Sequence, residues 1–171
     1  MVIDMQRAFQ EKTEWHVPRF DEAAAAIAKL QETTALPPVY TRFVRDEAET
    51  GSWSAYYQRW NEMRLAPGAE EWDLAVPLPE GATVIDAPTF SKWGPELAAI
   101  IPEGERMVLT GVATDCCVLS TALAAVDAGR HVTVVSDACA GATDEAHEQA
   151  LALMQMLSPM CETTTLADLL A

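Results

Sequence analysis

A chain of 171 residues is long enough for one domain with a substantial core, and 50% hydrophobic with 22% charged residues is typical of a globular protein. The formal net charge of −15 disfavours nucleic-acid binding, because an acidic surface repels phosphates. The same charge would suit a cationic substrate, although solubility is its simplest role. We find no apolar run of membrane-spanning length and no pattern of a signal peptide, so we expect a cytoplasmic protein without a membrane partner.

The cysteines and histidines do not form a metal-binding pattern. The four cysteines include no C-x-x-C pair, and the three histidines lie far apart along the chain. A zinc site is therefore poorly supported, and we expect no cofactor. In a reducing cytosol all four cysteines should be free thiols.

Short β-branched runs alternate with helical patterns along the chain. Strands are predicted over 2–4, 39–43, 83–85, 107–112, 131–136 and 161–165, and helices over 19–33, 94–100, 117–128 and 143–157. Pro37 and Pro38 separate the first helix from the second strand. This alternation predicts a single α/β domain over 1–171, with helices on both faces of a mostly parallel sheet of roughly six strands, a three-layer α/β/α fold.

Residues 46–80 form a long excursion that contains three of the five tryptophans, with a short helix expected near 54–63. Long connections in compact domains are often functional, so the excursion could be a lid or a substrate wall. It could equally be an apolar patch that packs on the body or on a second subunit. Within it, Trp53, Tyr57 and Trp60 are candidates for the substrate wall.

Three polar features follow predicted strands, where ligands bind in parallel sheets: Asp4, Asp86–Ala87 and the turn 114–117. Cys117 would lie at the first turn of the helix 117–128, where free N–H groups and the helix dipole lower a thiol pKa. Asp4 could accept the thiol proton and return it to a leaving amine. Alternatively, the cysteine is a small buried side chain and Asp4 a helix cap.

Two segments carry a family resemblance: VIDMQRAF at 2–9 and GVATDCCVLSTALAAVDAGRHVTVVSDACAG at 111–141. With Asp144, His147 and the later ETTTLADLL, they resemble the isochorismatase-like cysteine hydrolases, a family that includes nicotinamidases. The resemblance implies that Cys117 is the nucleophile and Asp4 the catalytic aspartate. It also implies a cis peptide between Val112 and Ala113, with the N–H groups of Ala113 and Cys117 as the oxyanion hole.

The chain departs from the family at the third catalytic member, a lysine expected at the position of Ala87 in VIDAPTFSKWGPEL. Lys92 is near in sequence but is expected to point elsewhere. Three explanations stay open: an engineered lysine-to-alanine variant, which we favour because the flanking residues keep the pattern; a natural member with altered chemistry; or substitution by Lys92. Under the first, restoring lysine at 87 should raise turnover and thiol alkylation.

The second departure concerns metal. Nicotinamidases of this family carry an Asp-x-His ligand set after the second strand, where this chain has TRFVRD, with Arg42 and Arg45 and no histidine. The family's isochorismate-cleaving members lack the cysteine. The resemblance therefore implies a metal-independent hydrolase that cleaves a C–N bond in a small amide, lactam or ureide through a Cys117 acyl-enzyme.

Other expectations concern partners and rival functions. The resemblance implies a homo-oligomer. A catalytically impaired member that binds a ligand or a protein is the first alternative, and Ala87 supports it. A nucleotide-binding domain is the second, but it needs a glycine-rich turn after the first strand, and residues 4–10 contain no glycine.

Overall fold

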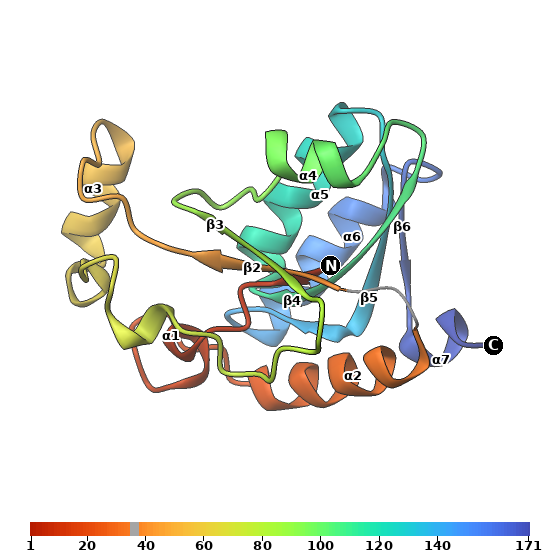
Figure 1. Cartoon of the computed structure of the whole chain (residues 1–171), viewed down its shortest axis with the longest axis horizontal. Coiled ribbons are helices and arrows are strands. Elements are labelled where there is room, and N and C mark those ends of the chain that lie inside the picture. Colours follow the sequence, from red (N-terminus) through yellow and green to blue (C-terminus); the bar gives the residue numbers. More distant parts are fainter. Residues whose placement is uncertain (35–37) are drawn as a thin grey trace.

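A six-stranded sheet in the order β3-β2-β1-β4-β5-β6 forms the centre of the protein, and each pair of neighbouring strands is parallel (Figure 1). The computed structural model describes residues 1–34 and 38–171, so Pro37 lies outside the described residues. The strands are β1 (Val2–Ile3), β2 (Val39–Phe43), β3 (Thr83–Ala87), β4 (Arg106–Val112), β5 (His131–Ala140) and β6 (Cys161–Thr164). The predicted three-layer α/β/α fold with a parallel sheet is confirmed.

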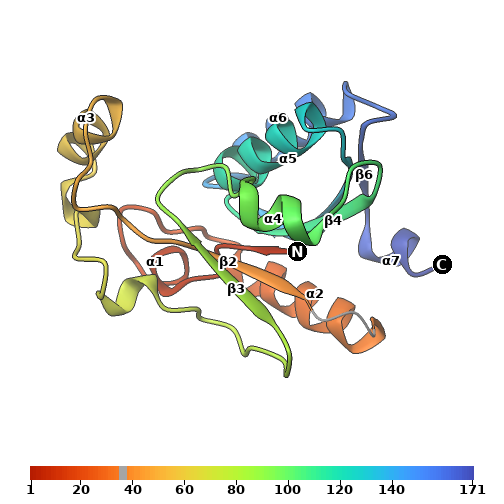
Figure 2. The same ribbon diagram turned by 45° about the horizontal axis from the view of Figure 1, so that its top comes forward.

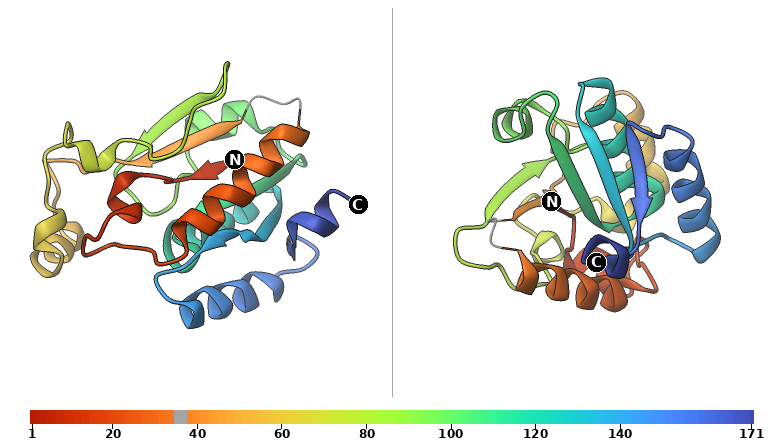
Figure 3. Two further views of the ribbon diagram at one scale, coloured as in Figure 1. Left: turned by 90° about the horizontal axis from the view of Figure 1, so that it is seen from below. Right: turned by 90° about the vertical axis from the view of Figure 1, so that its right-hand side faces the viewer.

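Helices cover both faces of the sheet (Figures 2 and 3). On one face lie α2 (Phe20–Thr33) and α7 (Leu166–Leu169), and on the other lie α4 (Pro95–Ile100), α5 (Leu119–Asp127) and α6 (Asp144–Gln155). The run of alanines in α2 favours a helix, and Phe20, Ala23 and Ile27 form its buried face. Within the described residues, no helix is long and apolar enough to cross a membrane.

The strands predicted at 83–85 and 131–136 are longer in the structure, and three short helical segments were not predicted. These segments are α1 (Arg7–Gln10), the one-turn 3₁₀ helix at Glu70–Trp72, and α7. A helix of one turn shows no apolar repeat in its sequence, which explains why pattern analysis misses it.

Gly111 brings the first strand close to β4. It pairs with Ile3 in the sheet and has a φ of +111°. A Cβ atom built on it would lie 2.1 Å from the carbonyl oxygen of Ile3, so no other residue fits without moving the backbone. The close approach sets the end of β1, and thus Asp4, beside the turn that follows β4.

The excursion 46–80 packs partly on the body of the protein and partly forms the wall of a cavity. It contains α3 (Ser52–Arg59) and a 3₁₀ turn (Asn61–Met63), and α3 stands beyond the carboxyl end of β2 (Figure 1). Tyr57, Met63 and Trp72 are buried in the core, so much of the excursion packs on the body. The buried Gln6 side chain holds it there by donating to the carbonyl oxygens of Phe43 (2.9 Å) and Trp72 (2.7 Å).

Candidate active site

Asp4 follows β1 and is fully buried. Its φ of +47° is unusual for a residue with a side chain. Thr41 of β2 donates its hydroxyl to Asp4 Oδ1 at 2.7 Å and accepts the Asp4 N–H at 3.2 Å. The carboxylate is therefore held in one orientation at the carboxyl edge of the sheet, as expected from the strand pattern.

Lys92 is the partner of Asp4. Its Nζ lies 3.0 Å from Asp4 Oδ2, and both side chains have no exposed surface. The ammonium also donates to the carbonyl oxygen of Thr89 at 2.7 Å and lies 4.7 Å from the centre of the Phe43 ring. The backbone N–H of Lys92 donates to Thr121 Oγ1 of α5 at 2.9 Å, which draws the loop after β3 back to the sheet edge.

The prediction that Lys92 points away from the site is therefore wrong. Ala87, the position where the resemblance implies a lysine, is the last residue of β3 and pairs with Phe43 of β2. Its neighbour Asp86 forms an ion pair with Arg42 on the exposed side of the strand, with 2.7 Å between Arg42 Nη2 and Asp86 Oδ2. The buried ammonium at this edge comes from the loop and not from the strand.

Cys117 lies in a π-helical turn (Thr114–Val118) between β4 and α5. The expected cis peptide between Val112 and Ala113 is present at the start of this turn. The predicted helix 117–128 is corrected in one respect, because α5 starts only at Leu119. Turns of this kind are frequent at functional sites. This one places Cys117 and Ala113 in the lining of the same cavity.

The environment of Cys117 keeps its thiol protonated. A hydrogen bond with the Cys116 thiol, then burial, then the charge of Asp4 raise the pKa of Cys117 well above its usual value, while Lys92 lowers it. The net direction is therefore opposite to the lowering that was expected from the helix terminus alone. Without a substrate, the carboxylate and the ammonium stand beside a neutral thiol.

His147 of α6 contacts the turn Thr114–Val118 from the side of α6, a role that sequence analysis did not assign to it. The buried His147 Nδ1 lies 2.8 Å from Thr114 Oγ1, and burial is the main cause that lowers the His147 pKa. Asp115 Oδ1 accepts the N–H of Ala142 at 2.9 Å. A Cβ atom on Gly141 would lie 2.8 Å from that same Asp115 oxygen, so the loop before α6 packs directly on the turn.

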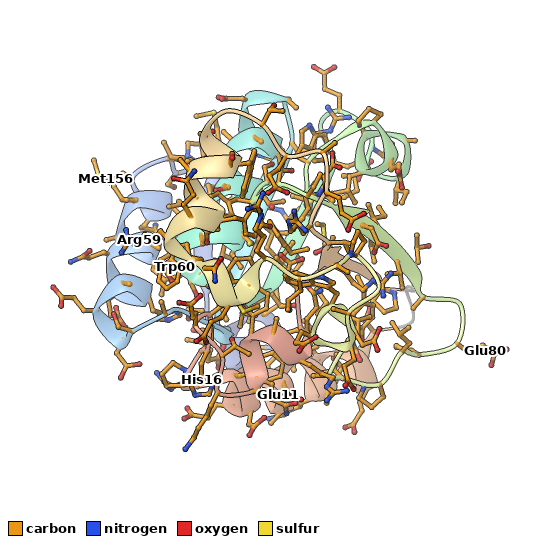
Figure 4. All side chains as sticks on the ribbon, turned by 90° about the vertical axis from the view of Figure 1, so that its left-hand side faces the viewer. Glu11, His16, Arg59, Trp60, Glu80 and Met156 are labelled. Carbon is orange, nitrogen blue, oxygen red and sulfur yellow. The ribbon has the colours of Figure 1, made fainter. Side chains whose placement is uncertain are left out.

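The thiol opens into a cavity of about 180 Å³, a volume on the order of that which holds one benzene ring. Cys116, Cys117 and Ala113 line one side of it. Figure 4 looks onto this edge of the molecule, with Trp60 and His16 labelled. Six large aromatic side chains also line it: Phe9, Trp15, Phe43, Tyr56, Trp60 and Phe90. Glu14, His16, Val17, Asp115 and Ala142 complete the lining.

The predicted wall residues divide between two layers. Trp60 lines the cavity, whereas Trp53 and Tyr57 are absent from the lining. The Trp53 ring packs behind, with its centre 4.8 Å from that of Phe90 and 5.5 Å from that of Tyr56. Burial, followed by the nearby Cys116 and Cys117, raises the pKa of Tyr56 well above its usual value, in keeping with its place beside the thiols.

The remaining cysteines lie away from the cavity. All four cysteines are free, and Cys139 and Cys161 are buried. Burial is the main cause that raises the pKa of Cys139 to about 12 and that of Cys161 to about 11. Among residues 1–34 and 38–171, no group of three His, Cys, Asp or Glu side chains could hold a metal ion.

Fold and site together define a three-layer α/β/α protein with an aspartate, a lysine and a cysteine at the carboxyl edge of its parallel sheet. The chain belongs to the Isochorismatase domain family, whose match covers residues 1–168. A stretch of 66 residues is 36% identical to the nicotinamidase of Escherichia coli. That stretch covers 39% of this chain and 31% of the nicotinamidase.

Solved structures share the fold over nearly the whole chain. A cysteine hydrolase from Pseudomonas syringae pv. phaseolicola is similar with a TM-score of 0.84 at 20% identity, covering 98% of this chain and 88% of that one. An isochorismatase-like hydrolase from Alkaliphilus metalliredigens gives 0.80 at 22% identity, with 99% and 93% covered. The pyrazinamidase of Pyrococcus horikoshii in complex with zinc gives 0.77 at 26% identity, with 96% of each chain covered.

Proposed function

We propose that this protein hydrolyses a C–N bond in a small amide, lactam or ureide, without a metal ion, through an acyl-enzyme on Cys117. The observation that carries the proposal is the buried ion pair of Asp4 and Lys92 beside a thiol that opens into a small cavity. A buried charge pair is costly to maintain, and such pairs with perturbed neighbours are concentrated at functional sites. The nicotinamidase and pyrazinamidase among the similar proteins add support for an amide as substrate.

In the first half of the reaction, Asp4 takes the proton of the Cys117 thiol while the sulfur attacks the substrate carbonyl carbon. The thiol is neutral at rest, so proton transfer accompanies the attack and does not precede it. The N–H groups of Ala113 and Cys117 stabilise the oxyanion of the tetrahedral intermediate. Asp4 then gives the proton to the nitrogen, the C–N bond breaks, and the amine leaves from a thioester on Cys117.

In the second half, Asp4 takes a proton from water, and the resulting hydroxide attacks the thioester carbonyl. The C–S bond breaks, the proton returns to the sulfur, and the acid leaves. Lys92 has a positioning role in both halves. It holds Asp4 Oδ2 at 3.0 Å and balances the negative charge that passes between carboxylate, sulfur and oxyanion.

The competing hypothesis of an impaired family member that only binds a ligand rested on Ala87. So did the hypothesis of an engineered lysine-to-alanine variant. Because Lys92 lies beside Asp4, the site has a lysine without one at position 87, and Ala87 no longer argues for either hypothesis. We propose that Lys92 has the role that the resemblance assigns to a lysine at position 87.

The test is a panel of small amides, including nicotinamide, a lactam and a ureide, with ammonia or amine release and the intact mass of the protein as readouts. We expect release with at least one compound and, after rapid acid quenching, a mass increase equal to the acyl group on the Cys117 peptide. A chelator should leave the rate unchanged. Release without any adduct on Cys117, or loss of activity with the chelator, would contradict the mechanism.

A cytoplasmic address and a homo-oligomeric state stay predictions for this chain. Light scattering of the purified protein measures the second directly. A mass equal to that of a single chain at micromolar concentration would contradict it.

A further inference from the structure

We propose that the substrate of this site carries a positive charge next to the amide, and that the cavity recognises it as a cation. The proposal rests on the amide hydrolysis proposed above and adds the class of substrate. Three observations lead to it: the rings that line the cavity, the charges that line it, and the cations of the protein that already use two of those rings.

The first observation is the ring surface. The six aromatic side chains named above form a large part of the cavity wall and come from four separate parts of the chain. The rings also pack on one another: the centre of the Tyr56 ring is 5.4 Å from that of Phe90 and 5.9 Å from that of Trp15. Aromatic faces carry partial negative charge, and several rings around a small cavity are the arrangement by which proteins bind ammonium groups.

The second observation is the sign of the charges in the lining. The lining includes the acidic residues Glu14 and Asp115, and it contains no lysine or arginine. His16 also belongs to it, with its Nδ1 2.9 Å from the carbonyl oxygen of Glu11. Both carboxylates accept backbone N–H groups: Glu14 from Glu62 at 3.1 Å, and Asp115 from Ala142 at 2.9 Å. Neither forms a salt bridge within the described part of the chain. A cation in the cavity would therefore meet two carboxylates that no side chain neutralises.

The third observation is that cations of the protein itself already lie over two rings of the same set. Lys92 Nζ lies 4.7 Å from the centre of the Phe43 ring, and the Arg59 guanidinium lies 5.0 Å from the centre of the Trp60 ring. Lys92 is paired with Asp4, and Arg59, labelled beside Trp60 in Figure 4, is not part of the lining. Phe9, Trp15, Tyr56 and Phe90 have no such cation over them within the described residues. Of these, Trp15, Tyr56 and Phe90 are partly exposed, so part of their ring surface is open to a ligand.

These features separate the possible substrates by charge. A carboxylate in this cavity would meet ring faces and two like charges, without an arginine or lysine to pair with. A neutral group would be accepted by the rings but would gain nothing from Glu14 and Asp115. A cation gains from both, and the net charge of −15 favours its approach.

The experiment uses three small amides that differ in charge and little in size. Glycine betaine amide carries a trimethylammonium group, its neutral isostere has a quaternary carbon in place of the nitrogen, and malonic acid monoamide carries a carboxylate. We expect kcat/KM for the cation to exceed that for the isostere by about tenfold, with the anion slowest. Equal rates for cation and isostere, or preference for the anion, would overturn the proposal.

A second readout separates this proposal from the proposed hydrolysis. Each compound is tested as a protector of Cys117 against iodoacetamide, which measures binding without turnover. If no amide is cleaved but the cation protects best, the proposed hydrolysis fails and cation recognition stands. If hydrolysis occurs and protection shows no dependence on charge, cation recognition fails alone. A lack of protection by all three compounds also overturns it.

Two variants with the same change of net charge test whether the effect is local. Glu14→Gln removes the lining carboxylate but keeps an oxygen that can accept the Glu62 N–H. Glu47→Gln removes an exposed carboxylate outside the lining. We expect Glu14→Gln to lower the ratio of cation to isostere about twofold to threefold, since this exposed charge is partly screened, and Glu47→Gln to leave it unchanged. An equal effect of both variants would mean that the overall charge of the protein causes the preference for the cation. That result would overturn recognition by the cavity.

Discussion

Two regions meet at Cys117, and they are built in opposite ways. On the sheet side, Asp4, Thr41 and Lys92 are fully buried or nearly so, and polar atoms of each have partners within 3.2 Å. On the other side, the wall from the connecting segments consists of ring surfaces in mutual contact and partly open to solvent. The first region depends on the positions of individual atoms, and the second on shape and surface.

The difference indicates where each region tolerates change. Removing one member of a buried ion pair leaves a charge without a partner in a place that water cannot reach. Removing a ring from the wall leaves a space that neighbours or water can fill. We therefore expect the sheet side to decide whether the reaction occurs and the wall to decide on which compound. The predictions below test this division.

The largest effect should come from the nucleophile itself. Cys117→Ala removes the sulfur on which we propose that the acyl-enzyme forms, so we expect kcat on the best amide of the panel to fall by more than about a thousandfold. Cys116→Ala is the matched control, because Cys116 also lines the cavity but is not needed for the attack. Its activity should stay within a few-fold of the parent protein. A comparable loss in both variants would mean that the nucleophile has been misassigned.

The next effect concerns stability. Lys92→Met leaves the Asp4 carboxylate buried without its counter-charge, and Asp4→Asn does the same to the ammonium, so each should cost about 3–5 kcal/mol in the free energy of unfolding. The double variant should lose much less than the sum, which urea unfolding measures as a coupling energy.

The exposed ion pair of Arg106 and Glu162 is the control for that cycle. Its atoms are 3.1 Å apart, but 51% and 46% of the two side chains are exposed. The same cycle with Arg106→Met and Glu162→Gln should give about 0–1 kcal/mol. Single losses at Asp4 and Lys92 as small as these would show that the pair is not buried in solution.

A smaller effect is expected in the reactivity of the Cys117 thiol. Its raised pKa means that alkylation by iodoacetamide is slow near neutral pH, and that the rate keeps rising above about pH 9, where an ordinary thiol levels off. Because Asp4 raises this pKa and Lys92 lowers it, Asp4→Asn should speed alkylation at a fixed pH, and Lys92→Met should slow it. Peptide mass spectrometry separates Cys117 from Cys116. A rate that levels off below pH 8 would contradict the assignment.

The sequence predicts the sheet and one side of the site well, for physical reasons. Each strand is a short apolar run, and Asp4 and Cys117 follow strands that are neighbours in the sheet, so the topology brings them together. Lys92 could not be predicted in the same way. It lies in the loop after β3, and the path of a loop leaves no periodic pattern in the sequence.

Helix geometry explains why only one of the three aromatic residues singled out in the sequence lines the cavity. Trp53 and Tyr57 are four residues apart on α3 and share one face, which packs behind the wall. Tyr56 and Trp60 are also four apart, and their face is turned to the cavity. Aromatic content alone marks the segment as important but does not say which face of the helix is turned inward.

The smallest expected effect answers the question that position 87 raised. Ala87→Lys was expected to raise turnover if that position had lost a catalytic lysine, but Asp4 Oδ2 already has an ammonium at 3.0 Å. A second lysine, at the end of β3, would find the Asp4 carboxylate already paired with Lys92. We therefore expect kcat/KM within about twofold of the parent protein. In the Lys92→Met background, the same substitution should not restore activity, because β2 lies between β3, which carries residue 87, and β1, which leads to Asp4. Restored activity in that double variant would show that a lysine at position 87 can take the role proposed for Lys92.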